Sequence, residues 1–190
     1  MPKKTNDDQD PFDLDFTKLF NPATPVKEPQ PTAQEEKALT EEAVIGESKL
    51  TSNGYFVRIN EAAPKRKPHS APPSVLVVED DEVTSTLLGR ILQANGFRVN
   101  YAATRAAIIS GLKLFPDIVI MDVMMPDANG FDILNRIRTH ATLKDMPVLM
   151  LTSLGSLDDI LKGLKLGANG YLTKPAKSKA LLDAIKQVLS

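Results

Sequence analysis

The stretch Ser74–Val83 reads SVLVVEDDEV, an apolar run followed by four consecutive acidic residues. The apolar run has the length and the β-branched content of a buried strand. Four adjacent carboxylates repel one another, so we expect them to have separate roles. Asp81 suits the N-cap of a helix that begins near Glu82, and Glu82 suits the positively polarised first turn of that helix. Glu79 and Asp80 then lie at the carboxyl end of the strand.

The alternation of strand and helix continues to the end of the chain. We expect strands at 74–78, 97–102, 117–122, 147–152 and 170–174, and helices at 82–95, 104–115, 131–140, 156–166 and 177–189. Thr104 and Ser156 suit helix N-caps, and Gly96 and Gly167 suit helix ends. Five βα units in series predict an α/β fold with a parallel sheet, helices on both faces and right-handed crossovers.

Polar residues follow four of these predicted strands. Glu79 and Asp80 end the first strand, Asp122 the third, Thr152 the fourth and Lys174 the fifth. In a parallel sheet, functional groups gather at the carboxyl ends of the strands. Three carboxylates share a small pocket only if a cation neutralises them, and oxygen ligands favour Mg²⁺. With a hydroxyl and an ammonium group, this set suits a phosphoryl group and a carboxylate nucleophile.

Each of these residues also has a purely structural interpretation. Asp122 could cap a turn, Lys174 could be a solvated charge and Thr152 could simply favour a strand. Any one of them alone would favour the structural interpretation. Their joint occurrence at successive strand ends favours a site.

This part of the chain resembles the receiver domain of two-component response regulators, which accept a phosphoryl group from histidine kinases or phosphotransfer proteins. The resemblance covers residues 74–190 and rests on the motifs VLVVEDD, DIVIMDVMMPDANGFDIL, PVLMLTS and GANGYLTKPA. It implies a flavodoxin-like fold: a five-stranded parallel sheet in the order 2-1-3-4-5, with five helices. It also implies a bacterial phosphorelay protein.

The resemblance implies roles for the acidic residues. Asp122 would be the phosphoacceptor. Glu79 and Asp80, together with Asp122 and the backbone carbonyl of Met124, would hold Mg²⁺. Of the pair, Asp80 is the better candidate for direct ligation.

Further roles follow from the same resemblance. Thr152 and Lys174 would contact the phosphoryl group, and the peptide bond from Lys174 to Pro175 would be cis, which X-Pro bonds allow at small cost. Thr152 and Tyr171 would form the switch that remodels the surface of the fourth helix, fifth strand and fifth helix. Met124 and Leu154 are apolar where the family flanks the path of water to the acyl phosphate. We therefore expect a long-lived phosphorylated form.

The expected protein is a phosphoacceptor that signals through protein interactions, not an enzyme acting on a separate substrate. Its partners would be a histidine kinase or phosphotransfer protein and an unidentified output protein, and phosphorylation could also drive dimerisation. One alternative is an interaction module or scaffold that is never phosphorylated. Another is a small α/β hydrolase or phosphatase with Asp122 as nucleophile. The complete residue set argues against the first, and the lack of an evident second acid or base argues against the second.

Residues 1–73 hold 10 of the 14 prolines and many charged residues, which predicts a mostly disordered extension. A helix at 11–20 would place four apolar side chains on one face, either for partner docking or as a transient element: Phe12, Phe16, Leu19 and Phe20. A short helix is expected at 33–45. The stretch KLTSNGYFVRI could add a strand to a partner's sheet or be a residual apolar segment.

Charge and composition exclude several classes of function. The net charge of -1 argues against nucleic acid as a partner, and no cysteine is present for a disulfide or a thiolate metal site. No stretch approaches 18 apolar residues, so we expect no membrane insertion and a cytoplasmic protein. The predicted fifth helix runs to the end of the chain, so we expect no C-terminal output domain.

Overall fold

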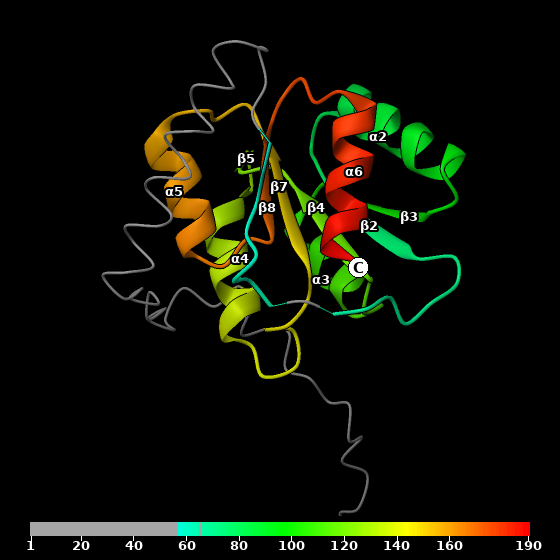
Figure 1. Cartoon of the computed structure of the whole chain (residues 1–190), viewed down its shortest axis with the longest axis horizontal. Coiled ribbons are helices and arrows are strands. Elements are labelled where there is room, and N and C mark those ends of the chain that lie inside the picture. Colours follow the sequence, from blue (N-terminus) through cyan, green and yellow to red (C-terminus); the bar gives the residue numbers. More distant parts are fainter. Residues whose placement is uncertain (1–56, 65) are drawn as a thin grey trace, which may run out of the picture.

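Helices cover both faces of one central sheet in the computed structural model, which describes residues 57–64 and 66–190 (Figure 1). The six strands of this sheet are β1 (Val57–Ile59), β2 (Ser74–Val78), β3 (Arg98–Ala102), β4 (Ile118–Met121), β7 (Val148–Thr152) and β8 (Gly170–Thr173). Their order is β1-β8-β7-β4-β2-β3. Five of these strands are parallel, and their order in the sheet, β8-β7-β4-β2-β3, is the one predicted for the five-stranded sheet.

The helices are divided between the two faces of the sheet. They are α2 (Glu82–Ala94), α3 (Arg105–Leu112), α4 (Gly130–Thr139), α5 (Leu157–Lys165) and α6 (Ser178–Val188). One apolar cluster joins the sheet to α3, α4 and α5, and a second joins it to α2 and α6. All five predicted helices are present, and their bounds differ from the predicted ones by a few residues at most.

Capping residues set the predicted boundaries. The Asp81 carboxylate accepts a hydrogen bond from the Thr84 amide at 2.7 Å, so this acid begins α2 as expected. Thr104 and Ser156 cap α3 and α5 in the same way. Gly167 has φ 88°, a left-handed conformation that side chains rarely adopt, and it follows the end of α5.

The predicted five-stranded parallel sheet is present, and β1 adds an antiparallel sixth strand beside β8 that the prediction did not include. Val57 and Ile59 pack against the apolar cluster on the α6 side of the sheet. The extension was expected to be mostly disordered, and the structure describes 57–64 and 66–73 in contact with the domain. The stretch KLTSNGYFVRI does contain a strand, but that strand pairs with the sheet of this chain and not with a partner's sheet. The predicted docking helix with Phe12, Phe16, Leu19 and Phe20, and the helix at 33–45, lie outside the described residues.

A short hairpin that the sequence did not predict follows β4. Its strands are β5 (Met124–Met125) and β6 (Ala128–Asn129). Asn129 then caps α4 by accepting a hydrogen bond from the Phe131 amide at 2.9 Å. The hairpin therefore returns the chain toward the end of β4. Within the described part of the chain, no helix combines the length and apolar character needed to span a membrane.

Candidate functional site

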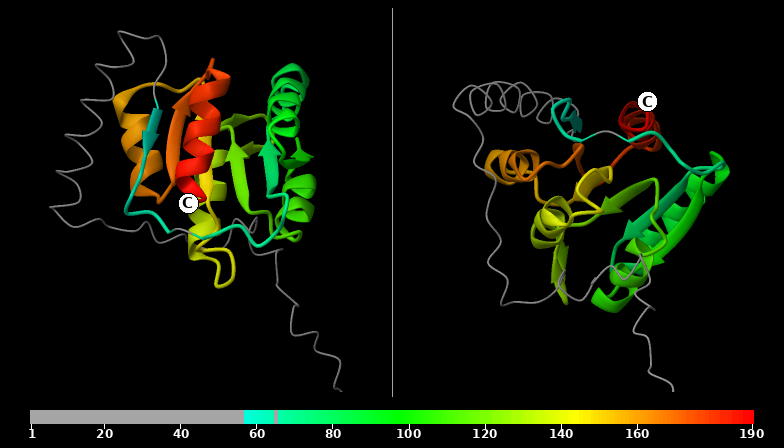
Figure 2. Two further views of the ribbon diagram at one scale, coloured as in Figure 1. Left: turned by 45° about the vertical axis from the view of Figure 1, so that its right-hand side comes forward. Right: turned by 90° about the horizontal axis from the view of Figure 1, so that it is seen from below.

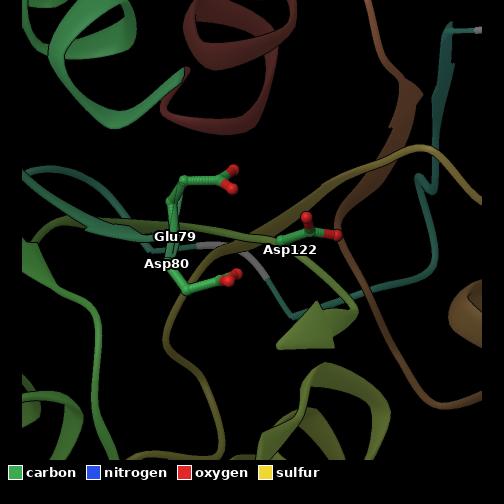
Figure 3. Close-up of side chains that lie close together, drawn as sticks. All are labelled: Glu79, Asp80 and Asp122. Carbon is green, nitrogen blue, oxygen red and sulfur yellow. The ribbon is translucent and has the colours of Figure 1, made fainter. Parts of the chain in front are cut away.

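The carboxyl edge of the sheet brings three acidic side chains together. Glu79 and Asp80 follow β2, and Asp122 follows the neighbouring strand β4. One carboxylate oxygen from each lies within 4.8 Å of the others, as Figure 3 shows for the side chains. The sequence prediction that these acids converge is confirmed.

Backbone contacts hold Asp122 at this edge. Its amide donates to the carbonyl of Val78 at 3.0 Å, which extends the pairing of β4 with β2. A Cβ atom on Gly130 would lie 2.3 Å from the Asp122 carbonyl, so the start of α4 approaches the backbone of Asp122 more closely than a side chain allows. Gly130 is a supporting residue that the sequence analysis did not identify.

Lys174 supplies positive charge to the pocket. Its Nζ atom lies 2.5 Å from Glu79 Oε2 and 2.6 Å from Asp122 Oδ2. Burial alone would lower the pKa of Lys174, but the bonds to Asp122 and Glu79 outweigh burial and raise it. The ammonium group therefore stays charged and holds the two buried carboxylates together.

The charges in the pocket do not balance without a further cation. Glu79 and Asp122 are 4% and 6% exposed, whereas Asp80 is exposed. Burial raises the pKa of Glu79, and the nearby Asp122 adds to this, although Lys174 opposes both effects. Three carboxylates and one ammonium leave two negative charges when all are ionised. An all-oxygen donor set with this excess fits a divalent hard cation such as Mg²⁺.

The position of Thr152 completes the polar edge. It ends β7, between β4 and β8 in the sheet, and its side chain is fully buried. The Lys174 amide donates to the Thr152 carbonyl at 2.8 Å, which fixes the start of the lysine loop against β7. The Thr152 hydroxyl accepts a hydrogen bond from the Leu154 amide at 3.3 Å.

Comparison with known proteins agrees with this geometry. The model of the response regulator receiver domain matches residues 75–186. The chain belongs to this family.

Relatives of the receiver include two curated transcriptional regulators. The DNA-binding dual master transcriptional regulator RpaA of Synechocystis sp. is 34% identical over 124 residues, which cover 62% of this chain and 49% of RpaA. The transcriptional regulatory protein CusR of Escherichia coli is 38% identical over 119 residues, covering 60% of this chain and 50% of CusR. This chain thus spans about half the length of these relatives.

A solved structure covers the receiver almost completely. The chemotaxis response regulator CheY4 of Vibrio cholerae is similar with a TM-score of 0.58 and 34% sequence identity. The similarity covers 62% of this chain and 98% of CheY4. Two-component signalling by phosphorylation is therefore implied by the family, and Mg²⁺ binding is typical of it.

Tyr171 of the receiver is fully buried on β8. Its hydroxyl donates to the Leu154 carbonyl at 3.0 Å. Burial raises the pKa of Tyr171, and the negative charges of Asp159 and Asp122 add to the effect. Thr152 and Tyr171 thus both bond to the backbone of Leu154, which links the two predicted switch residues. Their movement on phosphorylation stays a prediction.

Two other predicted features lie close to the pocket. The peptide bond between Lys174 and Pro175 is cis, as expected. Met124 lies two residues after Asp122, and its amide donates to Asp122 Oδ1 at 3.2 Å. The proposed use of the Met124 carbonyl as a metal ligand stays a prediction.

Proposed function

We propose that the receiver accepts a phosphoryl group on Asp122 from a histidine kinase or phosphotransfer protein and signals through a phosphorylation-dependent protein interaction. The observation that carries this proposal is the Lys174 ammonium shared by Asp122 and Glu79 in a pocket with a third carboxylate. A buried acid next to one cation, with an excess of negative charge, suits a nucleophile that works beside a metal ion.

The chemistry follows from the hydrogen bonds of Asp122. Its Oδ1 accepts a hydrogen bond from the Met124 amide, and its Oδ2 accepts one from the Lys174 ammonium group. A carboxylate oxygen attacks phosphorus, the bond from phosphorus to the donor nitrogen breaks, and an acyl phosphate forms. Lys174 then pairs with the phosphoryl oxygens. Asp80, Glu79 and Asp122 would hold Mg²⁺, which supplies charge neutralisation between the phosphoryl group and the acids.

We also propose that this chemistry is confined to phosphorylation and dephosphorylation of the protein itself. The groups that hold Asp122, a backbone amide and an ammonium, are suited to retain a phosphoryl group and less suited to activate a separate substrate. We place the protein in the cytoplasm and propose no contact with nucleic acid, which its net charge of -1 supports.

The test is incubation with phosphoramidate or acetyl phosphate and Mg²⁺, followed by intact mass. We expect one phosphoryl group on the wild-type protein and none on Asp122→Asn. Asp80→Asn should lose the Mg²⁺-dependent reaction. Asp117→Asn, at the opposite end of β4, is the matched control and should still be phosphorylated. Absence of a mass gain in the wild-type protein would support the unphosphorylated interaction module instead.

A further inference from the structure

The edge of the sheet beside the pocket is occupied by a segment from outside the receiver motifs. In β1, Val57 pairs with Leu172, Arg58 with Tyr171 and Ile59 with Gly170. Figure 2 shows this short strand alongside β8 at the outer edge of the sheet. The chain therefore covers, with its own backbone, the open edge that β8 would otherwise present to solvent.

The two faces of β1 contact different parts of the domain. Val57 and Ile59 pack on the apolar cluster that contains the core residues of α6. Directly paired residues of antiparallel strands project to the same face, so Arg58 lies on the face of Tyr171. The middle residue of β1 is thus placed next to the buried aromatic residue that bonds the Leu154 loop.

β8 connects this edge to the phosphoryl-acceptor pocket. Lys174 directly follows β8, and its side chain bonds Glu79 and Asp122. Phosphorylation of Asp122 replaces its single carboxylate charge with roughly two negative charges on the phosphoryl oxygens at neutral pH, and these compete with Glu79 for the ammonium group. A change in the partners of Lys174 therefore acts at the pocket end of β8, and β1 pairs with the edge of β8 that faces away from β7.

The residues after β1 are held more firmly than β1 itself. The Asn60 amide donates to the Asn169 carbonyl at 2.9 Å, and the Asn60 side chain donates to the Leu164 carbonyl at 3.2 Å. Further along, the Ser70 hydroxyl and the His69 amide donate to Asp117. A three-residue edge strand with one neighbour, by contrast, belongs to the least stable part of a fold. β1 can therefore separate from β8 while the segment after it stays in place.

We propose that β1 is the element that reads the state of the pocket: it pairs with β8 in the unphosphorylated protein, and phosphorylation of Asp122 weakens that pairing and exposes the β8 edge. The inference rests on the proposed function. The direction follows from packing, since both faces of β1 match the arrangement of β8 and Tyr171 that accompanies the Lys174 ion pairs. A rearranged β8 fits this strand less well.

Hydrogen exchange on the full chain tests the inference, with intact mass measured on the same samples before and after phosphoramidate and Mg²⁺. The Arg58 amide, which faces Tyr171 in the ladder with β8, should exchange at least about tenfold faster after phosphorylation, and the amides of β2 should not change. Asp122→Asn treated in the same way should show no change. A confirmed mass gain with unchanged or slower exchange in β1 would overturn this inference and leave the proposed function intact. No mass gain would overturn both.

A variant tests the same coupling in reverse, because coupling between two sites is reciprocal. Val57→Asp removes an apolar contact of β1, so fluoroberyllate, a non-covalent phosphoryl mimic, should bind at least about fivefold more tightly with Mg²⁺. Leu114→Asp alters an exposed leucine that is 64% accessible and serves as the control. Equal affinity in Val57→Asp and the wild-type protein would contradict the proposal.

Discussion

An aspartate stands at each end of β4, and the two have opposite surroundings. Asp117 precedes the strand and is 1% exposed, and Asp122 follows it and is 6% exposed. Burial alone would raise the pKa of Asp117, but hydrogen bonds from Ser70, Ser74 and the His69 backbone outweigh it and hold the pKa at about 2. Asp122 instead lies beside two further carboxylates and one ammonium group.

The difference shows that the partners of a buried acid, and not burial itself, decide its use. Hydroxyl and amide donors stabilise the Asp117 anion where it is and tie residues 69–74 to the sheet, and the His69 imidazole nitrogen Nδ1 lies 2.6 Å from Asp117 Oδ1. Asp122 shares its one cation with Glu79 and lies beside a third carboxylate, that of Asp80. The first arrangement suits structure, and the second suits a reversible reaction with a charged group.

The largest effect is expected from removing the ammonium group of Lys174, the cation beside Asp122 at the carboxyl end of β4. Lys174→Met leaves Glu79 and Asp122 without their shared ammonium group and removes the group that would hold the phosphoryl oxygens. We expect phosphorylation by phosphoramidate to slow by about 100-fold, measured by intact mass over time. Lys179→Met, at an exposed lysine on α6, is the control and should match the wild type. A rate for Lys174→Met close to that of the wild type would contradict this role.

A change at Asp117, before the start of β4, should alter the stability of the protein and not its phosphorylation. The folded pKa of Asp117 is depressed from 3.8 to about 2, so the ionised group adds stability above pH 4 that is lost as the pH falls toward 2. Asp117→Asn should therefore lower the free energy of unfolding by about 2 kcal/mol at pH 7. Urea unfolding at a series of pH values should show that the difference in free energy of unfolding between the wild type and Asp117→Asn becomes smaller below about pH 4. A gap that does not depend on pH would disprove the charge-based explanation.

A smaller effect is expected on the lifetime of the phosphorylated protein. Leu154 is partly buried against the core, and Met124 is 58% exposed, so neither offers a polar group to position water near Asp122. Leu154→Glu introduces a carboxylate that can act on water, and it should speed the loss of the phosphoryl group by about tenfold. The decay is followed after removal of the donor, with Leu154→Gln as the uncharged control. Decay of the wild type within seconds, unchanged in Leu154→Glu, would rule out this explanation.

The smallest effect is expected at Asp81, which lies beside the site but caps the N-terminus of α2. Asp81 is the N-cap of α2, and its hydrogen bond to Thr84 lowers its pKa. Asp81→Asn keeps a side-chain acceptor, so thermal stability and Mg²⁺-dependent phosphorylation should both stay near wild type. Asp80→Asn, one position earlier, is the matched comparison and should lose phosphorylation. Equal loss in both variants would show that the acids do not have separate roles.

The alternation of apolar runs and helical periods was enough to predict the parallel strands, whereas their order in the sheet was predicted only from the resemblance to receiver domains. N-cap residues such as Thr104 and Ser156 placed the helix starts because their signal is local. The stretch that contains β1 was recognised as a candidate strand, but its partner was not. The β8 edge and the α6 side of the core, which stabilise β1, lie more than 100 residues away in sequence.

The sequence was enough to predict which residues of the site lie close together, but not how their side chains pair. Strand ends placed Glu79, Asp80, Asp122 and Lys174 at one edge, because parallel strands end together. The sharing of Lys174 between two carboxylates depends on side-chain geometry that spacing does not contain. The role of Asp117 was missed because its partners lie 43 to 48 residues earlier in the chain.

The most direct test is to locate the phosphoryl group itself. After phosphorylation with Mg²⁺, borohydride reduction converts an aspartyl phosphate to homoserine, which peptide mass spectrometry assigns to a position. We predict homoserine at position 122 and unmodified aspartate at positions 80 and 117. Homoserine at either of those positions, or none in protein that has gained a phosphoryl group, would contradict the assignment of the chemistry to the carboxyl end of β4.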